Sequence, residues 1–186
     1  MNLTNEINKI IDNLNNKEFK TVINSCENLI KSKVENTIIY NLYGQAYQNL
    51  AFYEKSIEKF EKSLELNNNN YFALNNIAIS FKATEKFLLS EKAYKQCLKI
   101  KPDFVVAIIN YANLKEFLNQ IHEAIDLNLS ALEHVEETKK AHLFSKLCRL
   151  YMSIGKIKDA RKYSIKLLEK YPTDTSFYEL HSEIAD

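Results

Sequence analysis

Similar residues recur every 34 positions through most of this 186-residue chain. If units are counted from Thr37, Tyr71 and Val105, the seventh place is large, the eighth is small and the twenty-eighth is leucine. The residues at these places are Tyr43, Ile77 and Tyr111, then Gly44, Ala78 and Ala112, then Leu64, Leu98 and Leu132. A period of this length is typical of stacked supersecondary units, because a single unit cannot bury its own apolar face.

Two further units extend the pattern in both directions. One opens two residues late, at Ala141, and another starts near Leu3 and matches in its second half. The leading helix of that first unit, which carries Ile7 and Ile10, is predicted to be out of register with the others. The expected repeats are 3–36, 37–70, 71–104, 105–138 and 141–174, followed by 175–186 as a final helix that either caps the array or opens another repeat.

The scarcity of turn-forming residues predicts an all-helical fold. The chain has only two glycines and two prolines, whereas a sheet protein of this size needs many more. Three cysteines that are odd in number and far apart, Cys26, Cys97 and Cys148, favour free thiols in a reducing cytoplasm. The sequence shows no basic-then-apolar leader and no long apolar run, which also favours a cytoplasmic protein without membrane association.

The 34-residue pattern resembles the tetratricopeptide repeat, a helix–turn–helix unit. The resemblance implies an all-α fold, a right-handed α-solenoid of about five helix pairs and a C-terminal helix. Tyr40, Leu74, Ile108 and Phe144 stand at the place where the family commonly has tryptophan. The proline near the end of the family's unit is present only as Pro102 and Pro172.

The two glycines have structural explanations in this frame. Small residues at the eighth and twentieth places should let paired helices approach closely, with Gly44 facing Ser56. The corresponding pairs are Ala78 with Ser90, Ala112 with Ala124, and Cys148 with Ala160. Gly155 lies in a predicted turn between helices, where a positive φ is useful.

Several chemistries are disfavoured by composition and spacing. Lys and Arg total 25 against 24 Asp and Glu, a balance that does not indicate a nucleic-acid partner. The four histidines, at positions 122, 134, 142 and 181, do not have the spacing of a metal site. The cysteines fall at packing places and favour inert thiols. We therefore expect no metal, no cofactor and no enzymatic activity.

The resemblance also implies a groove lined by the first helix of each unit. Amide side chains at its inner places suit a peptide bond, because an amide can both donate and accept hydrogen bonds. The groove begins amide-rich and becomes basic in the fourth regular unit. The predicted groove residues are Asn41, Gln45, Gln48, Phe72, Asn75, Asn76, Ile79, Asn110, Asn113, Phe117, His142, Lys146 and Arg149.

One partner of the family is disfavoured by the groove residues. Members that clamp the C-terminal carboxylate of a chaperone use Lys, Asn, Asn, Lys and Arg. At the matching places this chain has Asn41, Gln45, Asn76, Val106 and Asn110. Both cations of the third helix are missing, so the sequence disfavours binding of a chaperone C-terminus.

Three functions remain open at this point. The leading one is a non-catalytic protein–protein interaction scaffold that binds a peptide or a helix of a partner in its groove. A second is a repeat module of a larger enzyme, such as a glycosyltransferase or a sulfotransferase, that selects its substrate or partner. A third is self-association through the exposed terminal helix faces.

Overall fold

The computed structural model describes residues 2–185 of the chain, which form eleven α-helices, one short 3-10 helix and no strand. The helices divide into two compact units, Met1–Pro102 and Asp103–Asp186. The first unit contains α1 (Leu3–Asn15), α2 (Phe19–Lys31), α3 (Thr37–Asn49), α4 (Tyr53–Leu66), α5 (Tyr71–Ala83) and α6 (Phe87–Ile100). The second contains α7 (Val105–Phe117), α8 (Ile121–His134), η1 (Glu137–Lys139), α9 (Lys140–Ser153), α10 (Ile157–Lys170) and α11 (Thr175–Ala185).

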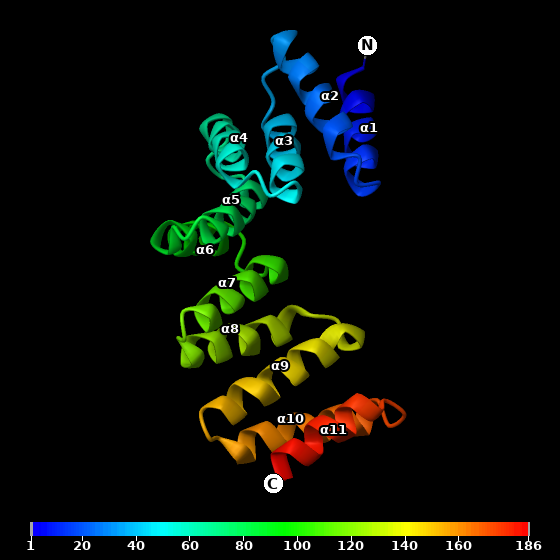
Figure 1. Cartoon of the computed structure of the whole chain (residues 1–186), viewed down its shortest axis with the longest axis vertical. Coiled ribbons are helices and arrows are strands. Elements are labelled where there is room, and N and C mark those ends of the chain that lie inside the picture. Colours follow the sequence, from blue (N-terminus) through cyan, green and yellow to red (C-terminus); the bar gives the residue numbers. More distant parts are fainter. Residues whose placement is uncertain (1, 186) are drawn as a thin grey trace. The chain divides into compact units, whose positions relative to one another are not determined.

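Within each unit, successive helices pack as antiparallel hairpins (Figure 1). Each hairpin also packs on the next one of its unit, as α4 does on α5 and α8 does on α9. This arrangement confirms the predicted fold class, an α-solenoid of tandem helix–turn–helix repeats. Its right-handedness stays a prediction, as does the division of the chain into five repeats of a single array.

The register of the first helix differs from the sequence prediction. Helix α1 begins at Leu3 and α3 begins at Thr37, so the two start 34 residues apart, like α3 and α5. The prediction of an out-of-register leading helix was therefore wrong for the backbone. The sequence misled because the side chains differ: Ile10, 2% exposed, occupies the place that Gly44 has in α3.

A left-handed residue ends the first helix of every hairpin. These residues have φ between 57° and 71° and are Lys17, Ala51, Glu85, Asn119 and Gly155. In each turn the N–H of the following residue donates to the carbonyl five positions earlier, as Phe52 does to Tyr47 at 2.9 Å. This is the Schellman ending of a helix. The predicted positive φ at Gly155 is confirmed.

The small side chains at the eighth place do not all have the predicted partner. Ser90 donates to the carbonyl of Ala78 at 2.7 Å, so this pair is as close as expected. At Gly44, however, the nearest atoms to an added Cβ belong to the ring of Phe60, at 2.5 Å. The prediction that Gly44 faces Ser56 was therefore incomplete: an aromatic side chain from the next turn of α4 fills the space.

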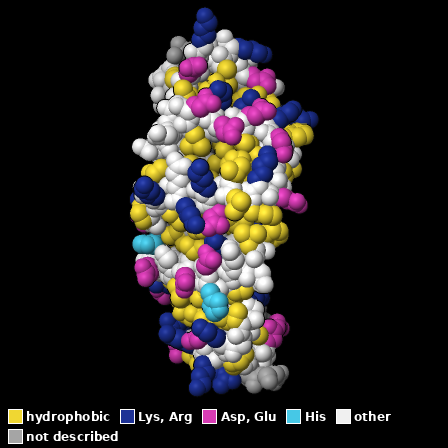
Figure 2. All heavy atoms as spheres, turned by 90° about the vertical axis from the view of Figure 1, so that its left-hand side faces the viewer, with side chains coloured by type: hydrophobic (Ala, Val, Ile, Leu, Met, Phe, Trp, Pro, Cys, Tyr) yellow, Lys and Arg dark blue, Asp and Glu magenta, His cyan; other side chains and the backbone are white. Residues whose placement is uncertain are grey.

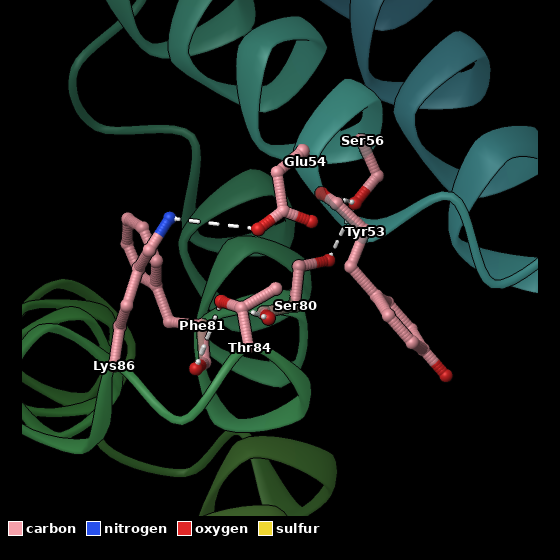
Figure 3. A network of polar contacts seen from close by, with 7 residues as sticks. All are labelled: Tyr53, Glu54, Ser56, Ser80, Phe81, Thr84 and Lys86. Carbon is pink, nitrogen blue, oxygen red and sulfur yellow. Dashed lines mark hydrogen bonds and ion pairs between the residues drawn. The ribbon is translucent and has the colours of Figure 1, made fainter.

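Ser56 instead joins two hairpins. Its hydroxyl lies 2.7 Å from that of Ser80 on α5 and donates to the carbonyl of Tyr53 at 2.8 Å (Figure 3). Both serines are fully buried. At the edge of the same contact, Lys86 lies 3.9 Å from Glu54. A buried polar link of this kind fixes the registration of α4 against α5.

The short helix η1, which has three residues, lies where the spacing between repeats is extended before the last hairpin. Helix α9 therefore begins at Lys140, one residue before the predicted start of its repeat. The ammonium group of Lys170, at the end of α10, donates to the carbonyl and to the carboxylate of Glu137. These contacts hold the inserted segment against the hairpin that follows it.

The final helix packs on the second unit. Leu180 and Ile184 of α11 are 4% and 2% exposed and join a core with Leu147 and Leu167. These two residues therefore lie against the preceding hairpin. Among the helices within residues 2–185, none is long and apolar enough to cross a membrane.

Candidate functional site

Three asparagine side chains form a chain of hydrogen bonds across the first helices of two neighbouring hairpins. Asn76 of α5 donates to Oδ1 of Asn41 on α3 at 3.3 Å. Asn75 in turn donates to Oδ1 of Asn76 at 3.0 Å. The Nδ2 group of Asn41 takes part in neither bond. The sequence predicted all three residues in the groove, and the structure brings them together.

Gln48 holds α3 and α5 together beside this cluster. Its Nε2 group donates to the backbone carbonyl of Asn76 and to the hydroxyl of Ser80, each at 2.7 Å. A side chain that makes both bonds has little rotational freedom. Gln48 therefore positions the turn of α5 that carries Asn76, whereas the sequence predicted it as a ligand contact.

Burial separates the predicted residues of this unit into two groups. Asn75 is only 4% exposed and Leu42, at the neighbouring inner place of α3, is 6% exposed. Asn41, Gln45, Asn76 and Ile79 are half-buried, and Phe72 is 50% exposed. Asn75 therefore lies beneath the surface, where its hydrogen bond holds the side-chain amide of Asn76 in place. Its burial depends on packing between helices, which a repeat pattern alone does not reveal.

Apolar side chains lie one helical turn before the half-buried amides of Asn41 and Asn76. Ile38 precedes Asn41 by three residues and is 45% exposed, and Phe72 precedes Asn76 by four. Residues three or four apart share a helix face. The ring of Phe72 lies 4.3 Å from that of Tyr71, centroid to centroid. This face of α3 and α5 therefore combines fixed amides with accessible apolar surface.

The predicted groove residues of the second unit are more varied. Asn110 and Asn113 on α7 are half-buried, and Phe117 at its end is 62% exposed. On α9, His142 and Arg149 are not buried, while Lys146 forms an ion pair with Glu116 of α7. Glu116 thereby neutralises the charge of Lys146, one of the residues that made the predicted groove basic in its fourth regular unit.

Three depressions of the surface lie at other places. One of about 500 Å³ lies along α10, and one of about 370 Å³ lies between α1 and α2. A third, of about 420 Å³, is lined by η1, α9 and α10. The amide cluster lines none of these three, and its half-buried amides beside exposed Ile38 and Phe72 suit an elongated ligand better than an enclosed small molecule.

The cysteines are buried thiols with raised pKa values. Burial raises the pKa of Cys26 to about 12 and those of Cys97 and Cys148 to about 11. Each donates a weak hydrogen bond to a backbone carbonyl, for example Cys97 to Tyr71 at 3.2 Å. A thiol with so high a pKa is a poor nucleophile at neutral pH.

Neither metal binding nor nucleic-acid binding gains support from the arrangement of charges. In the part of the chain that the structure describes, no three His, Cys, Asp or Glu side chains gather as a metal site requires. On the face shown in Figure 2, Lys and Arg are interspersed with Asp and Glu over most of the surface. A nucleic-acid interface is expected to carry a continuous basic stripe.

Solved structures with the same fold are repeat proteins of low sequence identity. The thermophilic tetratricopeptide repeat protein TTC0263 of Thermus thermophilus is 13% identical over 98% of both chains, with a TM-score of 0.70. PilF of Pseudomonas aeruginosa is 14% identical over 96% of this chain and 80% of its own, with a TM-score of 0.75. YrrB, described as having an unusual peptide-binding site, is 14% identical over 94% and 89%, with a TM-score of 0.71.

Stacked hairpins whose helices start at nearly constant spacing define a helical-repeat protein. The sequence profile of the tetratricopeptide repeat matches residues 38–70 and 73–104, which span α3 to α6. These two segments are tetratricopeptide repeats, as the sequence pattern predicted, and the chain has the fold of tetratricopeptide repeat proteins. No curated protein sequence matches it.

Proposed function

We propose that this chain is a non-catalytic interaction scaffold that binds an extended segment of a partner protein across α3 and α5. The observation that carries the proposal is the hydrogen-bonded pair Asn41 and Asn76, which lies on an open face with Ile38 and Phe72 beside it. The description of YrrB, a protein of the same fold with a peptide-binding site, supports the class of function.

The amides suit a peptide backbone because each can satisfy an N–H and a C=O group at once. Each such bond contributes about 0.5–1.5 kcal/mol net. Asn75 and Gln48 fix the amide of Asn76 and its backbone before any ligand arrives. Less side-chain entropy is then lost on binding, which strengthens the complex. Phe72 and Ile38 would contact apolar side chains of the bound segment.

The test begins with a partner captured by affinity from the native cell and identified. Its affinity is then measured for the wild-type chain and for the double variant Asn41→Ala/Asn76→Ala. Loss of two hydrogen bonds should weaken binding by about tenfold or more. The matched control is Gln96→Ala, which removes an exposed amide from α6. Equal affinity of wild type and the double variant would remove the proposal.

A second pair of variants tests the apolar part of the site. Phe72→Ala removes a half-exposed ring, and Leu88→Ala removes a side chain of α6 that is 86% exposed. Only the first should weaken the complex, by about tenfold, because burial of an aromatic side chain contributes most to an interface. Similar effects of both variants would place the contact elsewhere on the surface.

The remaining functional expectations stay predictions. They are self-association, a role within a larger enzyme, and residence in the cytoplasm. Light scattering at two protein concentrations would test the first of them.

A further inference from the structure

The last complete hairpin is far more basic than the rest of the chain. Residues 139–170 contain ten Lys and Arg against two acidic residues, Asp159 and Glu169, although the whole chain has a net charge of +1. In Figure 2, Lys and Arg side chains gather toward the lower end of the view, where Figure 1 places α10. The charge is therefore concentrated in one hairpin.

Several of these cations are neutralised by the chain itself. Lys139 pairs with Glu136, and Lys140 and Lys170 both pair with Glu137. Lys146 pairs with Glu116. The ion pairs of the described residues do not include the exposed cations of α10, which are Lys158, Arg161, Lys162 and Lys166. These four therefore keep their capacity to bind a carboxylate.

The four cations share one face of α10 with two isoleucines. Ile157 and Ile165 are 43% and 42% exposed and, with Arg161 between them, form a row of residues four apart. Lys158, Lys162 and Lys166 form a second row beside it, with the same spacing. Each row extends over about 12 Å of the helix. We call these six residues the α10 face. They line the depression of about 500 Å³, together with Glu169.

The α10 face points away from the core of its unit. Tyr163, Ser164 and Leu167, on the other side of the helix, are buried. Ser164 contacts His181 of α11 at 2.8 Å, and Leu167 joins the core formed with α11. Lys162 and Lys166 lie over the ring of Tyr163, at 6.0 and 5.6 Å from its centroid. The ring of Tyr163 attracts both ammonium groups and so favours defined positions for these two lysines.

We propose that the α10 face is a docking site for an acidic amphipathic helix of a partner protein. The row of isoleucines would contact an apolar row of the partner, and the row of lysines would pair with carboxylates in the adjacent row. The corresponding face of α4 lacks this character, since Glu54, Glu58 and Glu61 are acidic there and Lys62 is basic. Together, the positive charges and the apolar residues of the α10 face favour a polypeptide as the ligand.

Two other polyanions fit the α10 face less well. The phosphate backbone of a nucleic acid would leave Ile157 and Ile165 without an apolar contact. A lipid surface is bound by a wide apolar face with large side chains, whereas this face presents a single short row. The site is separate from the proposed groove on α3 and α5, so either proposal can fail without the other.

The experiment uses a fluorescein-labelled helical probe peptide of about 16 residues, with leucines four apart and glutamates in the adjacent row. An isomer with the same composition has its glutamates on the opposite face. Fluorescence anisotropy with the full chain should give tighter binding of the first peptide. The variant Arg161→Glu/Lys162→Glu should weaken that binding by at least about tenfold, since two attractive pairs become repulsive.

Two further variants make the result specific. Lys20→Glu/Lys92→Glu changes the net charge equally at exposed positions of α2 and α6 and should alter the affinity by less than about twofold. Ile165→Ser should weaken binding by about threefold or more, because it removes an apolar contact without changing charge. Circular dichroism verifies that all variants fold.

The proposal is overturned by any of three results. One is equal binding of both peptide isomers, which would indicate attraction by charge alone. Another is an equal loss of affinity in the Lys20→Glu/Lys92→Glu control. The third is tighter binding of phosphatidylserine vesicles or single-stranded RNA than of the acidic peptide. Isomer preference that is lost in Arg161→Glu/Lys162→Glu and reduced in Ile165→Ser supports it.

Discussion

The ring of Phe60 on α4 lies directly against the backbone of Gly44 on α3. A Cβ placed on Gly44 would stand 2.5 Å from Cε1 and 2.6 Å from Cδ1 of that ring. Phe60 is fully buried, so a shift of its ring would displace its neighbours. The hairpin of α3 and α4 therefore closes on an aromatic ring that only a glycine accommodates at this distance.

Replacement of Gly44 by alanine should destabilise the protein despite the better helix propensity of alanine. The propensity contributes about 0.5–1 kcal/mol in favour of the variant. Overpacking against a fixed ring costs about 1–3 kcal/mol. We expect a net loss of about 1 kcal/mol or more in the free energy of unfolding, measured by urea denaturation.

A double-mutant cycle isolates the contact between the two residues. Phe60→Leu alone should destabilise the protein because it leaves a cavity. In that background, however, Gly44→Ala should be neutral or stabilising, because the ring is gone and the propensity gain remains. An equal loss in both backgrounds would show that the cost of Gly44→Ala does not arise from Phe60.

At the left-handed turn residues we expect the opposite effect: replacement of a residue by glycine should raise the free energy of unfolding. Ala51 has a φ of 60° and is exposed. A left-handed conformation costs a residue with a Cβ about 1–2 kcal/mol, whereas glycine adopts it freely. Glycine loses about 0.4–1 kcal/mol more entropy on folding. Ala51→Gly should therefore raise the free energy of unfolding by about 0.5–1 kcal/mol.

Two comparisons test this explanation by thermal and urea unfolding. Gly155→Ala should lower stability by a similar amount, because an added Cβ there meets nothing within 4 Å and only the backbone conformation at φ 71° matters. Asn119→Gly should stabilise less than Ala51→Gly, since asparagine tolerates this conformation. A destabilised Ala51→Gly variant would contradict the argument.

The repeat pattern predicted the helix starts and the turn at Gly155 because both depend on local signals that recur with the period. It did not predict that Phe60 covers Gly44, since a ring can reach across from a different turn of its helix. The burial of Asn75 was missed for a related reason: neighbouring hairpins decide how much of a helix face stays open. The basic row on α10 is visible in the sequence, but the sequence does not show that the ion pairs of the described residues leave this row out.

Asn70 should contribute more to stability than the comparable cap Asn36. Both cap a first helix: Oδ1 of Asn36 accepts from Ile38, and that of Asn70 accepts from Ala73 at 3.2 Å. Asn70 also donates to the hydroxyls of Thr37 and Ser63, at 3.0 and 3.2 Å. Its side chain therefore links the start of α5 to the preceding hairpin.

The loss of a cap alone costs about 1 kcal/mol, and further lost hydrogen bonds add about 0.5–1.5 kcal/mol each. We expect a decrease of about 1 kcal/mol for Asn36→Ala and of about 2–3 kcal/mol for Asn70→Ala in urea unfolding. Asn70→Asp keeps the cap but loses the donor, so its stability should be intermediate. Equal effects of the two alanine variants would show that the link to Thr37 and Ser63 contributes nothing.

The carboxylate of Glu137 makes the last prediction, on pH dependence. Its oxygens lie 2.7 Å from the ammonium group of Lys140 and 2.8 Å from that of Lys170. Hydrogen bonds from Lys140 and Lys170 lower the pKa of Glu137 from its ordinary value of 4.5 to about 2. Because the pKa is lower in the folded state, the contacts stabilise that state above about pH 4.5 and lose their effect as the pH falls toward 2.

An NMR titration of the Glu137 side-chain carboxyl carbon should therefore have its midpoint near pH 2. In Lys140→Met/Lys170→Met the midpoint should rise toward 4.5, since both hydrogen bonds and both positive charges are absent. The control is Lys139→Met, which removes the partner of Glu136 and should leave the midpoint of Glu137 unchanged. A wild-type midpoint near 4.5 would mean that neither lysine holds this carboxylate in solution, and that Lys170 contacts Glu137 only through the bond it donates to the backbone carbonyl.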